Sequence, residues 1–353
     1  MPEDISVFYV DKYWQEWLGG VFFMVMIKKF KNKYDDIISV ENLLTAWKEF
    51  LNGKRKRKDV RVFDTKLADN IFDLHAKLKN KTYTHGEYKA FTITDPKKRN
   101  IHKAMVKDRL LHHAIHRKLY PFFDSVFISD SFSCRNGKGI HAALDRFRYF
   151  FRKVGRNNTR TVWVLKCDIR KFFASIDHNT LISILKSRIE DENITSLLEE
   201  IISSFEYGFP GKGLPLGNLT SQLFANIYMN EFDQYIKHKL RIKYYIRYAD
   251  DFVILSENKV CLESVIPRIH DFLNRRLLVS IHPNKVFIKT LSSGVDFLGW
   301  VHFPTHRVLR TVTKLRMFKN LKNSQRQEVL QSYLGLLSHG DGHELENRIR
   351  QGI

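Results

Sequence analysis

Two polar positions, Asp250 and Asp251, interrupt an otherwise largely apolar stretch between Tyr244 and Leu255, which reads YYIRYADDFVIL. Aromatic and β-branched residues on both sides of Asp250 and Asp251 predict two short strands joined by a tight turn, with the two carboxylates at its tip. Asp tolerates turn geometry, so an ordinary acidic turn also explains this stretch. A rigidly held carboxylate pair is equally what a divalent cation needs while phosphate oxygens move past it. Other motifs in the sequence are needed to distinguish an ordinary turn from a cation site.

The remaining pattern predicts many helices and a few strands. Helical periodicity is found at 40–53, 65–78, 107–120, 142–151, 180–189, 219–241, 262–277 and 329–337. Strands are predicted within 88–102 around a turn at Asp95 and Pro96, at 161–167, and as a pair around Val286 and Phe297. The helix after Gly217 is interpreted as amphipathic, with Asn226 and Asp233 away from its apolar stripe. Ser324 and Gln327 form a predicted capping box for the last helix.

Composition adds a strong positive charge to this picture. The 59 Lys and Arg residues outnumber the 38 Asp and Glu residues, and the net charge of +21 predicts a polyanionic partner such as nucleic acid. A basic protein at a membrane surface is the competing explanation, but the longest apolar run, 17–27, is shorter than the roughly 20 residues that cross a bilayer. The scattered Cys134, Cys167 and Cys261 fit a reducing compartment, so a cytoplasmic protein without a membrane partner is expected.

Three other features have an ordinary explanation beside a functional one. The basic run 54–58 is either a solvated loop or a phosphate contact. His112 and His116 have the spacing of zinc ligands but lack a third ligand, so they are expected at the surface or in a groove. Asp177 precedes a periodic segment and is interpreted as its N-cap.

Asp168 changes the interpretation of the acidic hairpin. By itself, a carboxylate at the end of a strand is explained equally well as a helix cap. Together with Asp250, Asp251 and the Gly- and Pro-rich loop 208–217, which leads into a long helix, it forms an ordered set. Two-metal phosphoryl transfer uses such a set, with two cations about 4 Å apart bridged by carboxylates from different strands.

These motifs resemble those of reverse transcriptases. YADD at 248–251 is similar to the family's catalytic hairpin, and KCDIRKFFASIDH at 166–178 is similar to its first metal-binding strand and turn. SFSCRNGKGIHAAL, GLPLGNLTSQLFANIY and VDFLGW match further family blocks in the right order. The resemblance implies an α+β right-hand polymerase whose antiparallel palm sheet carries the catalytic Asp residues. The implied domains are an N-terminal extension of unclear role at 1–39, fingers at 40–165, a palm at 166–300 and a short helical thumb at 301–353.

The resemblance also implies roles for matching residues. Asp168, Asp250 and Asp251 match the catalytic metal ligands, with the Ile169 backbone as a further ligand, for two Mg²⁺ ions that Mn²⁺ can replace. The implied nucleotide-binding residues are Lys97, Arg99, Phe173, Leu216, Gly217, Gln222 and Lys285. Phe173 matches the bulky residue that excludes a 2′-hydroxyl, whereas a solvated lysine explains Lys285 as well as a place beside the pyrophosphate does.

Several basic positions suit a nucleic-acid backbone. A loop punctuated by glycines carries two cations, and the segment after residue 310 has a basic face. With the tyrosine of YADD, the predicted nucleic-acid-binding residues are Arg135, Lys138, Tyr248, Lys314, Arg316 and Lys319.

One block departs from the pattern of most bacterial reverse transcriptases, which carry Gln-Gly followed after three residues by Ser-Pro. Here Leu216 precedes Gly217, and Gln222 follows Ser221. This departure resembles the enzymes of diversity-generating retroelements, which copy a template-repeat RNA into cDNA with frequent errors opposite adenine. It implies template RNA, an RNA–DNA hybrid, dNTPs and a small basic accessory protein as partners. Leu216 has no amide group to hydrogen-bond the nascent base pair. A mismatched nucleotide would therefore lose less binding energy at this position.

Two alternatives stay open. A phage-defence or CRISPR-associated reverse transcriptase has the same chemistry; a template-repeat and variable-repeat pair beside the gene would favour the retroelement, and nuclease or adaptation genes the alternative. An RNA-binding scaffold with an idle polymerase fold would also use the charge of +21. An idle site, however, has no need to keep three carboxylates that repel one another.

Overall fold

The computed structural model describes residues 13–18, 21–26, 28–94, 97–323 and 326–351. It divides into two compact units, each made of several chain segments. Unit 1 contains the described residues up to Ile128 with Lys171–Phe232 and Arg275–Val279, and unit 2 contains Ser129–Arg170, Asp233–Asn274 and the described residues from Ser280 onward. Packing defines these units, so the fingers, palm and thumb boundaries stay predictions. None of the described helices is long and apolar enough to span a membrane.

Unit 1 is mainly helical. Its helices are α1 (Tyr34–Ile38), α2 (Val40–Phe50), α3 (Lys58–Asp64), α4 (Leu67–Lys79), α5 (Val106–Asp124), α7 (Phe172–Ser175), α8 (His178–Lys186), α9 (Glu192–Ser203) and most of α10 (Leu219–Gln234). Leu43, Trp47 and Phe50 lie on one face of α2 and are buried, which contributes about 1.5–3 kcal/mol for each such side chain. Asn42 fixes α2 against α5, because its Nδ2 donates to the Ala114 carbonyl at 3.1 Å.

Two antiparallel hairpins also belong to unit 1. They are β1 (Tyr13–Leu18) with β2 (Val21–Met26), and β3 (Lys89–Ile93) with β4 (Arg99–Lys103). The predicted strands within 88–102 are confirmed by the β3–β4 register, in which Phe91 pairs with Ile101. The predicted turn at Asp95 and Pro96 lies outside the described residues.

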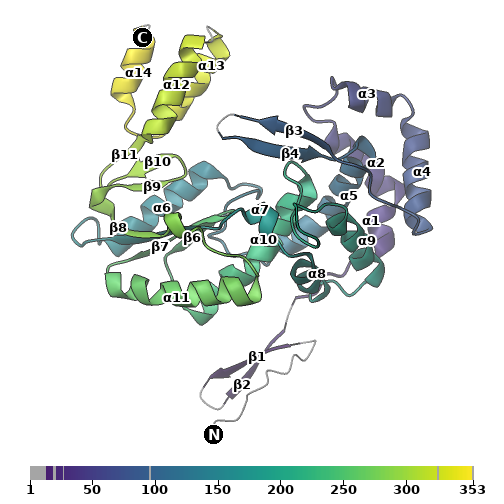
Figure 1. Ribbon diagram of the computed structural model, residues 1–353, viewed down its shortest axis with the longest axis horizontal. Helices are drawn as coiled ribbons and strands as arrows, with labels where there is room; N and C mark the ends of the chain where they lie inside the picture. Colours follow the sequence, from purple (N-terminus) through teal and green to yellow (C-terminus); the bar gives the residue numbers. More distant parts are fainter. Residues whose placement is uncertain (1–12, 19–20, 27, 95–96, 324–325, 352–353) are drawn as a thin grey trace. The chain divides into compact units, whose positions relative to one another are not determined.

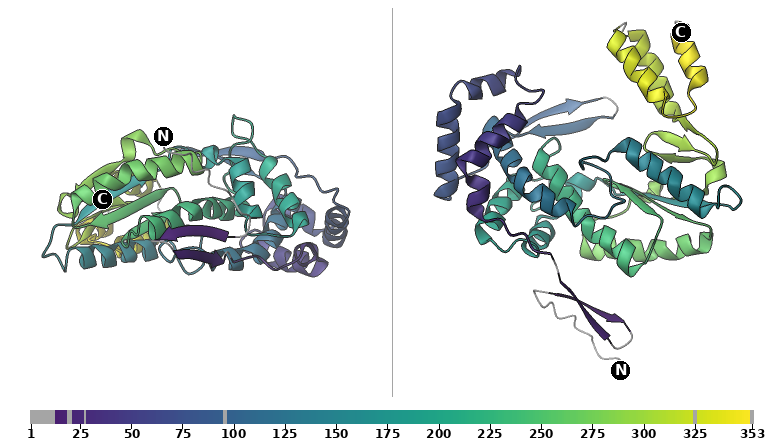
Figure 2. Two further views of the ribbon diagram at one scale, coloured as in Figure 1. Left: turned by 90° about the horizontal axis from the view of Figure 1, so that it is seen from below. Right: turned by 180° about the vertical axis from the view of Figure 1, so that it is seen from behind.

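The centre of unit 2 is a four-stranded antiparallel sheet in the order β6-β7-β5-β8 (Figure 1). Its strands are β5 (Trp163–Asp168), β6 (Tyr245–Tyr248), β7 (Asp251–Ser256) and β8 (Phe287–Thr290). Alternate residues of β5 and β7, such as Val164 and Val253, share a buried cluster with Phe147 of α6 (Ile140–Val154). Helix α11 (Lys259–Arg276) lies on the opposite face of this sheet (Figure 2).

A smaller sheet and three helices complete unit 2. The sheet has the order β11-β10-β9, with β9 (Val295–Phe297), β10 (Trp300–His302) and β11 (Arg307–Leu309). The helices are α12 (Thr311–Asn323), α13 (Gln327–Leu337) and α14 (His343–Arg350). Short helical turns of other types are η1 (Tyr235–Lys239), η2 (Pro283–Lys285) and η3 (Leu291–Ser293). Trp300, Met317 and Leu337 join these elements to the same buried cluster as α6.

The structure corrects two interpretations of polar residues. Helix α10 is not amphipathic: positions 220–230 are all buried except Gln222, and Asn226 and Asp233 lie inside rather than at the surface. Burial of Asp233 is tolerated because an arginine neutralises it. His112 is 1% exposed rather than a surface or groove residue, and its ring packs on that of His85.

Two predictions near the C-terminus were also wrong. The strands around Val286 and Phe297 do not pair with each other, since β8 pairs with β5 and β9 pairs with β10. The N-cap of α13 is Arg326, so Gln327 is the first residue of the helix and not its third residue, the position that a capping box requires. Ser324 lies outside the described residues.

Candidate active site

The predicted acidic hairpin is confirmed as β6–β7. Tyr248 pairs directly with Asp251, which leaves Ala249 and Asp250 in the turn. Ala249 has a φ of 55°, in the left-handed region that residues with a Cβ rarely adopt. Arg247 stabilises this turn, because its Nη1 donates to the Ala249 carbonyl at 3.0 Å.

The sheet register brings Asp168 to the same place. Asp168, the last residue of β5, pairs directly with Asp251 of β7, and cross-strand partners have Cβ atoms about 4.5–5.5 Å apart. The Ile169 backbone N–H donates to the Asp250 carbonyl at 3.3 Å. The three predicted carboxylates therefore lie at one end of the β5–β7 pair, within one unit.

Two lysines face this acidic group. Lys285 Nζ donates to both carboxylate oxygens of Asp168 at 2.9 Å, and Lys166 Nζ lies 3.6 Å from Asp251 Oδ1. Burial, together with the nearby Asp168 and Asp251 charges, raises the pKa of Asp250 to about 6. Burial also raises the pKa of Asp251, an effect that Lys166 partly opposes. The site thus holds more negative charge than its lysines neutralise in this buried environment.

The donor set fits a hard divalent cation. Asp251 Oδ1 is buried and has no hydrogen-bond partner among the residues that the structure describes. In the same residues, no three His, Cys, Asp or Glu side chains are arranged as a complete metal site. Mg²⁺ commonly binds through one or two carboxylates and takes its other ligands from water and substrate phosphates. The aspartates are therefore suited to a cation that arrives with a phosphate-containing substrate.

A buried ion pair supports the hairpin and was not predicted from the sequence. The Arg247 guanidinium donates to Asp233 through Nε at 2.8 Å and Nη2 at 2.6 Å, and both side chains are 0% exposed. Tyr245 Oη donates to Asp233 Oδ1 at 2.7 Å, and Arg247 Nη2 also donates to Ser131 Oγ at 3.0 Å. The sequence feature that could have indicated this pair is that Asp233 and Arg247, which have opposite charges, each lie within an apolar segment.

Unit 1 brings several predicted nucleotide-binding residues together. The His102 backbone N–H of β4 donates to the Leu216 carbonyl at 2.9 Å. A Cβ at Gly217, whose φ is 105°, would lie 2.7 Å from Ile101 Cγ2, so this close approach to β4 requires glycine. The Phe173 carbonyl accepts from Leu214 N at 2.7 Å, which ties Phe173 to the same loop.

The other predicted residues have simpler surroundings. Lys97, Arg99 and Gln222 are exposed in unit 1. In unit 2, Arg135 Nη1 donates to the Ser131 carbonyl at 2.9 Å, and Lys138 Nζ lies 5.0 Å from the centre of the Phe132 ring. These two cations thus have intramolecular partners. Tyr248 is half-buried beside the acids, and the remaining predicted residues, Lys314, Arg316 and Lys319, are on α12.

Known proteins share parts of this sequence. YkfC of Escherichia coli (strain K12) is 25% identical over 242 residues, which cover 58% of this chain and 61% of YkfC. The group II intron-encoded protein LtrA of Lactococcus lactis subsp. cremoris is 22% identical over 260 residues, or 55% of this chain and 42% of LtrA. The chain thus spans less than two thirds of the length of these relatives. A solved structure of apo telomerase from Candida tropicalis, truncated from its C-terminal domain, covers 68% of this chain and is itself covered to 60%, with 13% identity and a TM-score of 0.48.

The match to a family profile is more extensive. The profile described as reverse transcriptase (RNA-dependent DNA polymerase) matches residues 92–302, more than half of the 353 residues, and includes the β5 and β6–β7 aspartates. Domains of this family generally use divalent metal ions, and the mixed helix and sheet structure fits a right-hand polymerase. The chain therefore belongs to the reverse transcriptase family.

Proposed function

We propose that this chain is a Mg²⁺-dependent RNA-directed DNA polymerase whose reaction centre is formed by Asp168, Asp250 and Asp251. The observation that carries the proposal is the β5–β7 register, which sets Asp168 opposite Asp251 and beside the Asp250 turn. Natural folds avoid such like-charge clusters unless a cation compensates them. Asp251 Oδ1, which is buried near Lys166 and accepts no hydrogen bond from the residues that the structure describes, supports the same conclusion.

The proposed chemistry is transfer of a nucleotide to a 3′-hydroxyl. Bound Mg²⁺ would lower the pKa of the attacking hydroxyl and stabilise the charge on the triphosphate. Asp168 and Asp250 would be the principal ligands of the metal, with Asp251 as the neighbouring acid, and the Asp250 turn is kept in place by the hydrogen bond that Ile169 N donates to the Asp250 carbonyl. Lys285 is 45% exposed and contacts Asp168, so it could shift to the pyrophosphate and supply a proton as that group leaves.

The residues of unit 1 support a role in choosing the nucleotide. Leu216 and Gly217 lie in a loop tied to β4, the strand that begins at Arg99, and Phe173 of α7 accepts a hydrogen bond from Leu214 of the same loop. In the proposed arrangement, Lys97 and Arg99 grip the triphosphate, Arg by a bidentate contact. Phe173 would then exclude a 2′-hydroxyl, which makes dNTPs the substrates.

Primer extension tests the proposed activity. The purified chain should extend a DNA primer annealed to an RNA template when dNTPs and Mg²⁺ are present, and it should stop when EDTA removes the metal. The Asp168→Asn variant removes one charge without changing the size of the side chain, and we expect its incorporation rate to fall at least about 100-fold. An equal rate in the variant would refute a reaction centre at Asp168.

We propose further that the chain serves a diversity-generating retroelement, with a template-repeat RNA and a small basic accessory protein as partners. The support is the Leu216–Gly217 and Gln222 departure in the sequence. Sequencing of the cDNA made from a mixed RNA template tests this subclass, since we expect mismatches to concentrate opposite adenine. Errors spread evenly over the four template bases would favour a phage-defence or CRISPR-associated enzyme. An idle RNA-binding scaffold would make no cDNA.

A further inference from the structure

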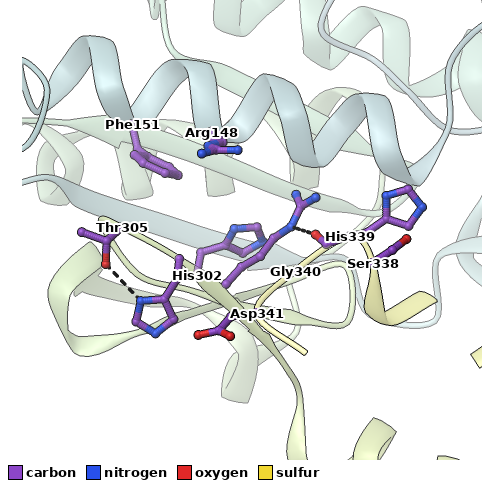
Figure 3. Close-up of a pocket in the computed structure, with 10 residues that line it drawn as sticks. Arg148, Phe151, His302, Thr305, Ser338, His339, Gly340 and Asp341 are labelled. Carbon is purple, nitrogen blue, oxygen red and sulfur yellow. Dashed lines mark hydrogen bonds between the residues drawn. The ribbon is translucent and has the colours of Figure 1, made fainter. Parts of the chain in front are cut away.

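The acidic end of β5 and β7 differs in its charge balance from the polar cavity of unit 2. That cavity, of about 380 Å³, lies between α6, the β10–β11 hairpin and the segment that follows α13 (Figure 3). The charge of Arg307 is met there within the chain, because its Nε donates to the His339 carbonyl and its Nη1 lies 3.9 Å from the Asp145 carboxylate. At the acidic end, three carboxylates outnumber two lysines, so the position of each lysine matters more.

Lys166 is a buried lysine in the middle of the four-stranded sheet. It lies on β5 two residues before Asp168, so both side chains are on the same face of the sheet. Its cross-strand partner Val253 belongs to the buried apolar cluster that includes Phe147, and the side chain of Lys166 is only 11% exposed. A cation in apolar surroundings is costly unless polar groups compensate it.

Two oxygen atoms compensate this cation. Lys166 Nζ donates to the Asp296 backbone carbonyl at 3.0 Å and lies 3.6 Å from Asp251 Oδ1. The carbonyl is fixed in place, since Asp296 pairs with Val301 of β10 and its carboxylate accepts from Arg310. At 3.6 Å the ammonium group offsets the charge of Asp251 without forming a hydrogen bond to Oδ1. Lys166 is therefore held by β9 beside the aspartate.

The two lysines of the site differ in their freedom to move. Lys285 is 45% exposed and hydrogen-bonds both oxygens of Asp168 at 2.9 Å, so it can withdraw into water. Lys166 is buried and tied to β9, so its charge stays beside Asp251. A fixed positive charge at this place repels a divalent cation and weakens its binding to the carboxylates. Phosphate oxygens of a substrate would then have to supply the missing affinity.

We propose that Lys166 is a positioning residue that acts as a fixed counter-cation of Asp251 and keeps the affinity of the nucleotide-free site for divalent cations low. The inference rests on the proposed function, in which a cation at these aspartates serves nucleotide transfer. Lys166 acts through Asp251 and not on the substrate. A purely structural lysine would stabilise the β5–β9 contact but would have no specific effect on cation binding.

Binding of Mn²⁺ to the chain without RNA or nucleotide tests this role, because electron paramagnetic resonance detects the free ion. Lys166→Met removes the charge and keeps an unbranched side chain. Lys289→Met is the matched control: Lys289 is exposed on β8 and pairs with Val164, about 13 Å along the sheet from Asp168. We expect at least about tenfold tighter Mn²⁺ binding in Lys166→Met and a change below about twofold in Lys289→Met. Equal affinities of the two variants would overturn the proposal.

A double-mutant cycle shows whether Lys166 acts through Asp251. In an Asp251→Asn background the carboxylate that Lys166 offsets is gone, so Lys166→Met should change Mn²⁺ affinity by less than about threefold. A gain as large as in the wild-type background would overturn the positioning role.

Lys166→Gln removes the charge but keeps an N–H group for the Asp296 carbonyl, so it should show the same gain in affinity. Circular dichroism checks folding, and the glutamine variant decides the question if Lys166→Met does not fold. No nucleotide is incorporated in these assays. Tighter binding in an inactive polymerase would therefore contradict only the proposed function, and unchanged binding in an active one would contradict only the role of Lys166. Absence of Mn²⁺ binding in every variant would contradict both.

Discussion

Removal of Arg247 should destabilise unit 2 and the catalytic hairpin together. The Arg247→Met variant leaves Asp233 as a buried, uncompensated charge, because both side chains are 0% exposed. Breaking a buried ion pair in this way costs about 3–5 kcal/mol, a large part of the roughly 5–15 kcal/mol that stabilises a folded protein. The variant also loses the donors to Ser131 Oγ and to the Ala249 carbonyl, both at 3.0 Å.

The double variant Asp233→Leu, Arg247→Met separates charge from packing. It removes both charges, so we expect it to be more stable than Arg247→Met by about 2 kcal/mol or more. Tyr245 Oη and the Ala249 carbonyl still lose a partner in the double variant, so recovery should be incomplete. Arg247→Lys keeps the charge but not the bidentate contact, and we expect an intermediate stability.

Urea unfolding followed by circular dichroism measures these differences, since the free energy of unfolding falls linearly with urea concentration. Hydrogen exchange of peptides from β6 and β7 shows whether the loss is local to the hairpin. A loss below about 1 kcal/mol in Arg247→Met would contradict the account of a buried pair. So would a double variant as unstable as the single one.

Three further predictions concern substrate choice, fidelity and pH. Phe173→Val should allow ribonucleotide incorporation in single-turnover assays with rNTPs, and a variant still strict for dNTPs would remove Phe173 from sugar selection. Leu216→Gln should lower the error frequency opposite template adenine several-fold in sequenced cDNA, whereas unchanged errors would exclude Leu216 as their cause. Because the folded-state pKa of Asp250 is raised to about 6, its protonated form favours the fold. Without metal, the free energy of unfolding should therefore fall as pH rises from about 4 through 6, and this fall should be smaller in Asp250→Asn. Identical pH profiles of the two proteins would show that Asp250 ionises normally.

The strands of the site could be predicted because their pattern is local. Aromatic and β-branched residues on both sides of the Asp pair identify β6 and β7, and the β-branched run before Asp168 identifies β5. The direct pairing of Asp168 with Asp251 could not be read in the same way. It depends on the register between two strands distant in sequence, which tertiary packing fixes.

The buried ion pair shows why polarity misled the prediction for α10. A carboxylate in a helix usually marks the solvent face, so the sequence pattern predicts Asp233 on the outside. Its partner Arg247 is on a different element, and only the three-dimensional contact makes burial acceptable. The same limit applies to the contact between Leu216 and His102 in unit 1, where one loop carbonyl completes the hydrogen bonding of a distant strand.

The central claim is that the acidic end of β5 and β7 joins nucleotides on an RNA template. Single-nucleotide incorporation by wild type, Asp250→Asn and Asp177→Asn tests it most directly. Asp177 is the matched control, because its Oδ1 accepts from Thr180 N at 2.9 Å as the N-cap of α8. We predict incorporation by wild type and by folded Asp177→Asn, and a loss of at least about 100-fold in Asp250→Asn. Equal incorporation by wild type and Asp250→Asn would contradict the account.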